Sequence, residues 1–303
     1  MFFMLLLKGF IIGIAFIIPG VSGGTLAIYL GIYDKLLHAI GHIVTETKKS
    51  IQFLVPVFLG VGLSVVLLAK ILGYFIEKNS LVTLFFFIGL ILGGIPYLFK
   101  QTKGAKIKPA HYIAFAVAFA IVILMLLYKL NYSSTGLETF PKTIGNFALI
   151  FMLGLIASTT MIIPGISGSA LLMVLGFYTA IVTNVVGNLF DFSSFSYNLF
   201  VMIPFGLGAV VGIVVFSKVL ETLLKKYKSE TYYAIIGFII ASIIVIFFEI
   251  KDPTSSAIYD FQTPIYEDLG TYFVNNVFSF LLALVALVSG TFISLWNSKL
   301  ELK

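Results

Sequence analysis

Apolar residues occur along this chain in long runs, without the alternation that marks an amphipathic helix or a half-buried strand. Six runs reach the roughly 20 residues that a helix needs to cross the hydrocarbon core of a bilayer. They cover residues 53–76, 81–99, 110–130, 199–220, 231–250 and 273–296. Two further apolar segments, 2–40 and 146–183, are interrupted near the middle by Pro-Gly-x-Ser-Gly. The pattern predicts an all-α membrane protein with six continuous spans and two broken segments.

The two broken segments belong to an internal repeat. At an offset of 145 residues, Pro19-Gly20-Val21-Ser22-Gly23 aligns with Pro164-Gly165-Ile166-Ser167-Gly168. At an offset of 148 residues, the matches are Pro56, Gly60, Lys70 and Gly89 with Pro204, Gly208, Lys218 and Gly237. We therefore predict two related halves, residues 1–135 and 136–303, within one integral membrane domain. Each half contains one broken segment and three spans.

The distribution of lysine indicates how the halves are oriented. If each broken segment enters and leaves the membrane on the same side, twelve of the 19 lysines fall on one side and four on the other. The alternative would separate the lysine clusters at 100–108 and 225–228. Because cytoplasmic loops are enriched in basic residues, we expect inverted halves with both termini in the cytoplasm. Each half is then a re-entrant helical hairpin plus three transmembrane helices.

Composition excludes several classes of protein. With 60% apolar residues, 11% charged residues and a mean hydropathy of +1.10, the chain is neither a soluble globular domain nor a disordered one. The absence of Cys excludes disulfides and thiolate metal sites, and the absence of Arg excludes bidentate clamps on phosphate. Without a metal-ligand cluster, a P-loop or a dinucleotide motif in the sequence, we expect no metal or cofactor. We attribute the net charge of +6 to lysine-rich loops and expect no nucleic-acid partner.

The two interruptions carry the candidate binding site. Proline ends the preceding helix, glycine permits close backbone approach, and Ser or Thr caps the helix that follows. Free N–H groups and hydroxyls at such a break suit an anion, above all phosphate. Paired breaks in inverted halves are typical of a transporter's central site. The candidate substrate-binding residues are Ser22, Gly23, Gly24, Thr25, Ser167, Gly168 and Ser169; we assign no catalytic residue.

Lys70 and Lys218 lie near the end of the first continuous span of each half. They either extend to the membrane interface or, one near each face, meet an anionic head group. Asp34 and His38 are the titratable residues nearest the first break. They are therefore the candidates for carrying a coupling proton.

Three alternatives remain open at this point. Pro-Gly can merely kink a membrane helix. Gly20-Val21-Ser22-Gly23-Gly24 also matches the G-x-S-x-G motif of serine hydrolases, but that motif needs a strand-turn-helix setting and a nearby base. The three histidines all lie in the first half. A secondary transporter of a small soluble anion would use the same breaks with a water-filled path closed to lipid.

The two motifs, followed by Gly31-Ile32-Tyr33 and by Gly176-Phe177-Tyr178, resemble those of the PopT-type undecaprenyl phosphate translocases, a polytopic bacterial family. The resemblance covers nearly the whole chain. It implies transport of the carrier undecaprenyl phosphate from the outer to the cytoplasmic leaflet of the cell membrane, for reuse in peptidoglycan and teichoic acid synthesis. The residues alone favour an anionic ligand in a lipid environment and do not specify a prenyl chain.

Overall fold

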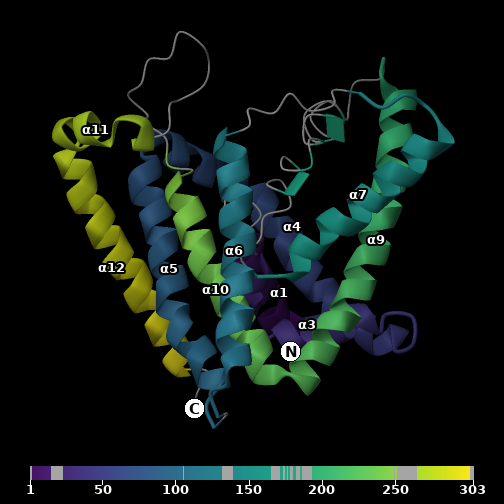
Figure 1. Ribbon diagram of the computed structural model, residues 1–303, viewed down its shortest axis with the longest axis horizontal. Helices are drawn as coiled ribbons and strands as arrows, with labels where there is room; N and C mark the ends of the chain where they lie inside the picture. Colours follow the sequence, from purple (N-terminus) through teal and green to yellow (C-terminus); the bar gives the residue numbers. More distant parts are fainter. Residues whose placement is uncertain are drawn as a thin grey trace.

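A computed structural model of the chain describes residues 2–14, 23–104, 106–131, 139–164, 193–248 and 265–300, with single positions at 171, 172, 175, 177, 180, 181, 185 and 250. In these ranges the regular structure is helical and contains no strand, as the hydropathy pattern predicts (Figure 1). The helices are α1 Phe2–Ile14, α2 Gly23–Tyr29, α3 Tyr33–Gly41, α4 Thr47–Lys78, α5 Ser80–Gln101, α6 Pro109–Asn131, α7 Ile144–Ile162, α9 Phe195–Lys226, α10 Lys228–Phe248, η2 Ile265–Asp268, α11 Leu269–Asn275 and α12 Val277–Leu300.

Six helices in the described part of the chain are long and apolar enough to cross a membrane, which confirms the predicted number. They are α4, α5, α6, α9, α10 and α12. The predicted run 273–296 is wrong at its start, because α11 ends at Asn275 and α12 begins at Val277. The side chain of Asn276 donates to the carbonyl of Tyr272 at 3.1 Å, a local bond of the kind that competes with helix continuation.

The helix before the second break ends where the sequence predicts. α1 is described from Phe2 to Ile14, and the residues between it and Pro19 lie outside the described part. α7 ends at Ile162, and Ile163 is extended at φ −78°, ψ 119°, as the residue before proline should be. Residues 19–22 of the first motif, and all of the second motif after Pro164, lie outside the described residues. The re-entrant course of both segments stays a prediction.

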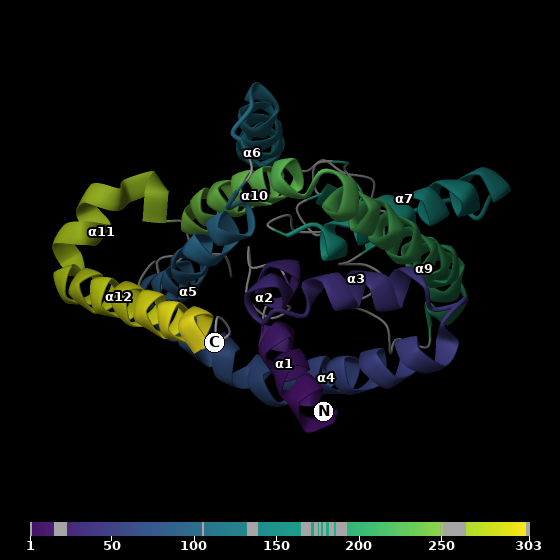
Figure 2. The same ribbon diagram turned by 90° about the horizontal axis from the view of Figure 1, so that it is seen from below.

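Helices pack in four close pairs, which are α1 with α4, α7 with α9, α5 with α12, and α6 with α10 (Figures 1 and 2). Glycines allow the close approach in each pair. In the last two pairs, Gly89 of α5 faces the backbone of Leu287 in α12, and its repeat equivalent Gly237 of α10 faces the backbone of Phe115 in α6. The second long helix of each predicted half therefore packs against the last long helix of the other half.

The lysine-rich turns gather at one end of the helices. The turn between α9 and α10 and the loop after α5 lie in the lower part of Figure 1, together with the N and C labels, whereas the turn between α4 and α5 lies at the opposite end, as α11 does. This arrangement agrees with the grouping of lysines expected from the loops. That the lower end faces the cytoplasm remains a prediction.

Candidate functional site

The first break packs against the residues that open the second motif. A Cβ at Gly24 would lie 3.1 Å from the carbonyl oxygen of Ile162 and 3.4 Å from the nitrogen of Pro164. The hydroxyl of Tyr33 donates to the same Ile162 carbonyl at 2.7 Å. The start of α2 and the end of α7 are thus in direct contact, although 138 positions separate Gly24 from Ile162.

The structure describes only part of the predicted substrate site. Gly23, Gly24 and Thr25 form the first turn of α2, and Thr25 is buried with 2% of its surface exposed. The predicted residues Ser22, Ser167, Gly168 and Ser169 lie outside the described residues.

Of the two predicted lysines, Lys70 and Lys218, the structure describes the side chain of Lys218 alone. The side chain of Lys70 lies outside the described part. Lys218 is exposed on α9 and contacts the end of α3, where a Cβ on Gly41 would lie 3.0 Å from its Cγ. Lys218 therefore stands one helical turn from Glu221, at the edge of a polar pocket described below.

The short helix α2 is held at its far end by a cation and a glycine turn. Lys8 of α1 donates to the carbonyl of Leu30 at 2.5 Å, where a positive charge complements the partial negative charge of a helix C-terminus. Gly31 has φ 64°, a conformation that glycine adopts without strain. This turn directs the chain from the break into α3.

An apolar groove of about 520 Å³ lies beside the first break. Ile14, the last residue of α1, and Leu26, which follows Thr25, line one wall, while α5 and α12 provide the others. At the α12 rim, Phe292 and Ile293 are 60% and 51% exposed. The groove therefore offers a lipid-like environment next to the polar residues of the break.

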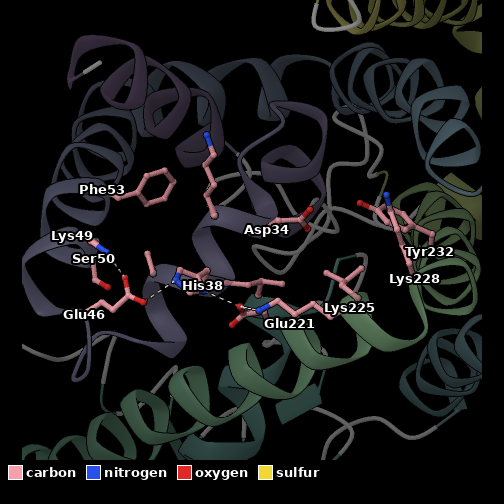
Figure 3. A pocket seen from close by; sticks show the side chains of 14 residues that line it. Asp34, His38, Glu46, Lys49, Ser50, Phe53, Glu221, Lys225, Lys228 and Tyr232 are labelled. Atoms are coloured by element: carbon pink, nitrogen blue, oxygen red, sulfur yellow. Dashed lines mark hydrogen bonds and ion pairs between the residues drawn. The ribbon is translucent and has the colours of Figure 1, made fainter.

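A second pocket, of about 590 Å³, is polar and lies near the lysine-rich end (Figure 3). It is formed by α3, the start of α4, the end of α9 and the start of α10. The charged and polar side chains that line it are Asp34, Lys35, His38, Glu46, Lys49, Ser50, Glu221, Lys225, Lys228 and Tyr232.

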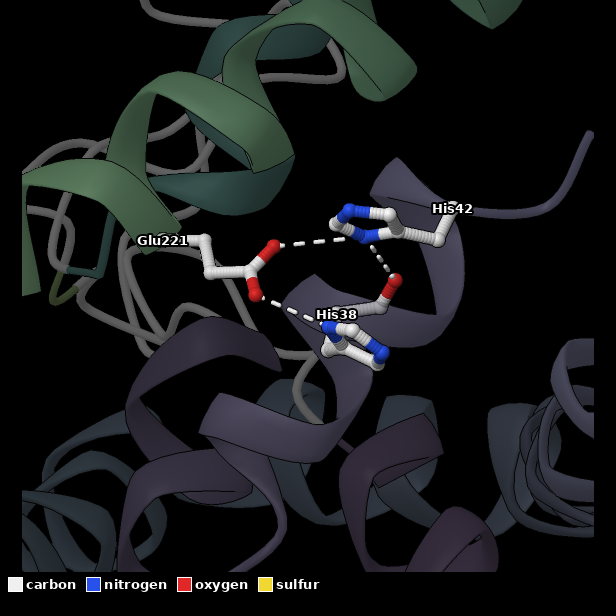
Figure 4. Close-up of side chains that lie close together, drawn as sticks. All are labelled: His38, His42 and Glu221. Atoms are coloured by element: carbon white, nitrogen blue, oxygen red, sulfur yellow. Dashed lines mark hydrogen bonds and ion pairs between the residues drawn. The ribbon is translucent and has the colours of Figure 1, made fainter. Parts of the chain in front are cut away.

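Glu221 is the centre of this pocket (Figure 4). Its side chain is only 10% exposed, and its Oε1 lies 2.8 Å from His38 Nδ1 and 2.7 Å from Lys225 Nζ. Its Oε2 lies 3.4 Å from His42 Nδ1. A single carboxylate from α9 thus accepts from His38 of α3 and from Lys225, while His42 Nδ1, just after α3, makes the longer contact and also lies 3.1 Å from the His38 carbonyl.

His38 is flanked by carboxylates on both sides of its ring. Its Nε2 lies 3.5 Å from Glu46 Oε1, so a doubly protonated ring would find an acceptor at each nitrogen. Its ring also stacks on that of His42, with centroids 4.3 Å apart.

Two carboxyl groups outside the membrane spans have displaced pKa values. Burial raises the pKa of Asp34, Lys228 opposes this shift and Glu221 adds to it. A hydrogen bond from Lys49 lowers the pKa of Glu46. Asp34 is therefore held closer to its neutral form than Glu46 is.

Sequence reasoning found His38 and Asp34 but missed Glu221. The contact between His38 and Glu221 joins positions 183 residues apart, and no spacing rule connects them. The i, i+4 spacing of His38 and His42, which puts both on one helix face, is the signal that the sequence did contain. The fold also brings ligand atoms of His38, His42 and Glu221 within 4.8 Å of one another, a cluster that the sequence did not predict.

The three histidines have partners other than the motif serines among the described residues. His38 and His42 face Glu221, and His111 Nε2 lies 2.9 Å from the Ser229 hydroxyl. The described residues combine the buried Thr25 at the start of α2, an apolar groove beside it and a charged pocket at one end. This set of surfaces suits an amphipathic ligand with an anionic head.

Comparisons with known proteins agree with this picture. The VCA0040-like, undecaprenyl phosphate translocase-like family matches residues 12–258. A polyprenyl-phosphate transporter of Staphylococcus aureus is 33% identical over 247 residues, which cover 80% of this chain and 85% of that protein. One of Vibrio cholerae is 29% identical over 251 residues, covering 78% and 75%. The search of solved structures found no significant match. The chain thus belongs to the undecaprenyl phosphate translocase-like family of membrane proteins.

Proposed function

We propose that this protein carries undecaprenyl phosphate across the bacterial cell membrane, from the outer to the cytoplasmic leaflet, and so returns the carrier to cell-wall synthesis. The observation that carries the proposal is the apolar groove directly beside the contact between the two breaks. A lipid phosphate needs an anion site and an apolar site next to each other. The names of the two relatives supply the substrate class.

In this proposal the phosphate binds between the breaks. Backbone N–H groups and hydroxyls of residues 22–25 and 167–169 replace its water. The contact of Gly24 with Pro164 supports a site shared by both motifs. Lys70 and Lys218 act as counter-charges, one toward each face of the membrane. The prenyl chain follows the groove from Leu26 toward Phe292 on α12.

The same proposal includes inverted halves that alternately open the site to the two leaflets. The packing of α5 against α12, and of α6 against α10, joins a helix of one half to a helix of the other in both cases, and this supports such a two-fold arrangement. Transporters of this kind commonly place their sites where two repeats meet.

Energetics favour coupling to a proton. A phosphate monoester carries roughly −1.5 to −2 charges near neutral pH, and moving one charge against 100 mV requires about 2.3 kcal/mol. Inward movement of the dianion is therefore opposed by several kcal/mol. A tenfold gradient of the carrier offers only about 1.4 kcal/mol. A proton that travels with the substrate lowers its charge, and Asp34 and His38 are the candidates for its route.

Transport in proteoliposomes tests the site. Ser22→Ala and Ser167→Ala should each slow inward movement of undecaprenyl phosphate by about ten- to a hundredfold, because a lost bond to a charged group is worth roughly 1.5–3 kcal/mol, and the double variant should be slower still. Ser289→Ala, an exposed serine on α12, is the matched control and should leave the rate unchanged. Normal transport by the double variant would refute the phosphate site.

An inward proton gradient should accelerate transport by the wild type, and a protonophore should abolish that gain.

Transport of a small soluble anion is the rival, and the groove distinguishes the two. Leu26→Trp fills the groove beside the break. We expect it to slow undecaprenyl phosphate far more than a short-chain prenyl phosphate. Uptake of inorganic phosphate by the wild type, unaffected by Leu26→Trp, would favour the rival.

A further inference from the structure

The polar pocket around Glu221 has the form of an anion site that is filled by the protein's own carboxylate. Glu221 is held by His38, His42 and Lys225, and its carboxylate is nearly buried. Hydrogen bonds from charged donors are the strong ones. A carboxylate has acceptor sites for all of these nitrogen groups, and the three terminal oxygens of a phosphate monoester would offer acceptors to the same groups.

A metal ion suits this cluster less well than an anion does. The spacing of the His38, His42 and Glu221 ligand atoms is compatible with one. However, Lys225 already donates to Glu221 at 2.7 Å, and Lys35, Lys49 and Lys228 line the same pocket. A divalent cation would be repelled by these ammonium groups, whereas an anion would be attracted.

The charges that face the pocket leave cations in excess. On the α3 side lie Asp34, Lys35 and His38, with His42 beside Glu221. The start of α4 contributes Lys49, preceded by Glu46. From the second half, α9 contributes Glu221 and Lys225, and α10 contributes Lys228 and the Tyr232 hydroxyl. Glu46 and Lys49 pair with each other at 3.3 Å. Once Glu221 moves aside, three lysines and two histidines face the carboxyl of Asp34 alone.

We infer that this pocket is a second binding site for a phosphate monoester, in which the incoming phosphate displaces Glu221 from His38, His42 and Lys225. The inference rests on the proposed function, because it assigns the pocket to the lipid head group on the lysine-rich side. The seven residues of α2, about 10 Å of helix, separate the break from the turn into α3. The pocket thus lies on the path from the break toward that end of the molecule.

Displacement of Glu221 makes binding depend on pH. An anion binds more tightly to a protonated imidazole than to a neutral one. Binding should therefore strengthen as the pH falls. A probe that does not itself titrate near neutral pH, such as sulfate, isolates the contribution of the protein.

The experiment uses histidine as its own reporter. The full chain, purified in detergent with EDTA and labelled with ¹³C at histidine, carries three such residues, and His111, bonded to Ser229 outside the pocket lining, is an internal reference. Sulfate should shift the His38 and His42 signals saturably and leave His111 in place, with tighter binding at pH 6 than at pH 8. Glu221→Gln should tighten sulfate binding about tenfold, because it removes the competing carboxylate. Lys225→Gln should weaken it about tenfold, because it removes one bond from a charged donor to the anion. Lys103→Gln, an exposed lysine in the loop after α5, is the charge-matched control.

Each outcome bears on the proposal. The absence of saturable shifts at His38 and His42 in the wild type at pH 6 would overturn it, as would weaker binding by a folded Glu221→Gln protein. If that variant does not fold, Lys228→Gln replaces it, because Lys228 is exposed, and unchanged sulfate affinity would then contradict the pocket. The Ser22→Ala, Ser167→Ala double variant should keep the sulfate response. If this double variant transports normally and keeps the sulfate response, the phosphate site at the breaks is refuted, whereas the binding site in the pocket is supported.

Discussion

The crossing of α1 with α4, before the first break, and the crossing of α7 with α9, before the second, have the same close glycine contacts. They differ at one position, where a glycine and a serine exchange helices. In α1 and α4, Gly9 faces the backbone of Val57 and Gly60 faces that of Leu6. In α7 and α9, Gly154 faces Phe205 and Gly208 faces Phe151 in the same way. One turn further, the first crossing pairs Gly13 of α1 with Ser64 of α4, whereas the second pairs Ser158 of α7 with Gly212 of α9.

This exchange shows what the crossings require. A Cβ on Gly13 would lie 2.6 Å from the Cβ of Ser64, so one member of each pair must lack a side chain. Which helix provides the glycine makes no difference to the spacing. Because small residues let membrane helices approach closely, the pairs set the distance between the helices that lead into each break.

The largest effect should come from filling the crossings. Gly60→Ala and Gly208→Ala each place a methyl group against backbone that cannot rotate away. We expect each to lower the free energy of unfolding by about 1–3 kcal/mol, measured as thermal unfolding in detergent. Gly62→Ala and Gly206→Ala, on the same two helices with nothing within 4 Å of the added carbon, are the controls. Equal effects of all four substitutions would mean that the crossings are not close-packed.

The contact between the two breaks gives the second prediction. Tyr33→Phe removes the bond to the Ile162 carbonyl and leaves that buried acceptor without this donor. The expected loss is about 1–2 kcal/mol, seen in the unfolding temperature. The proposed transport should fall as well, because the bond joins the start of α3 to the end of α7. A variant with wild-type transport and unchanged stability would show that this contact is unimportant for the site.

The serine exchange provides a finer test. Ser158 donates to the Leu155 carbonyl at 2.8 Å, whereas the buried Ser64 hydroxyl has no partner among the described residues. Ser158→Ala should therefore cost about 0.5–1.5 kcal/mol, and Ser64→Ala should be neutral or slightly stabilising. A clear loss on Ser64→Ala would contradict the second expectation and would point to an acceptor outside the described ranges.

Much of the helical framework follows from sequence, and much of the polar pocket does not. Continuous apolar runs predict the six spans because the bilayer fixes the length of a helix that crosses it. Pro164 predicts the end of α7 because proline restricts the residue before it. The Asn276 break escaped this reasoning, since asparagine in an apolar run interrupts a helix only where its side chain finds a carbonyl.

The pocket could not be predicted because it depends on tertiary packing. His38 and His42 share a helix face, but Glu221 joins them only when α3 packs against α9. The internal repeat gives no guidance either. At the same offsets, the residues equivalent to Asp34, His38 and Glu221 are Thr179, Thr183 and Gly73. These three titratable residues of the pocket therefore align in the repeat with residues that carry no titratable group.

The smallest expected effect comes from replacing Asp34, which aligns with Thr179 in the repeat, by its neutral analogue asparagine. Because burial raises the pKa of Asp34, the folded chain binds its proton more tightly than the unfolded chain. Stability should then fall as the pH rises from the ordinary carboxyl range, about 3.9, through the raised value. Asp34→Asn removes this slope, so the variant should be more stable than the wild type at neutral pH and lose that advantage in acid. Glu46→Gln is the control of opposite sign, because the pKa of Glu46 is lowered by Lys49 and its contribution to stability is lost as the pH falls. Identical pH profiles for the wild type and Asp34→Asn would show that the folded protein does not raise the pKa of Asp34.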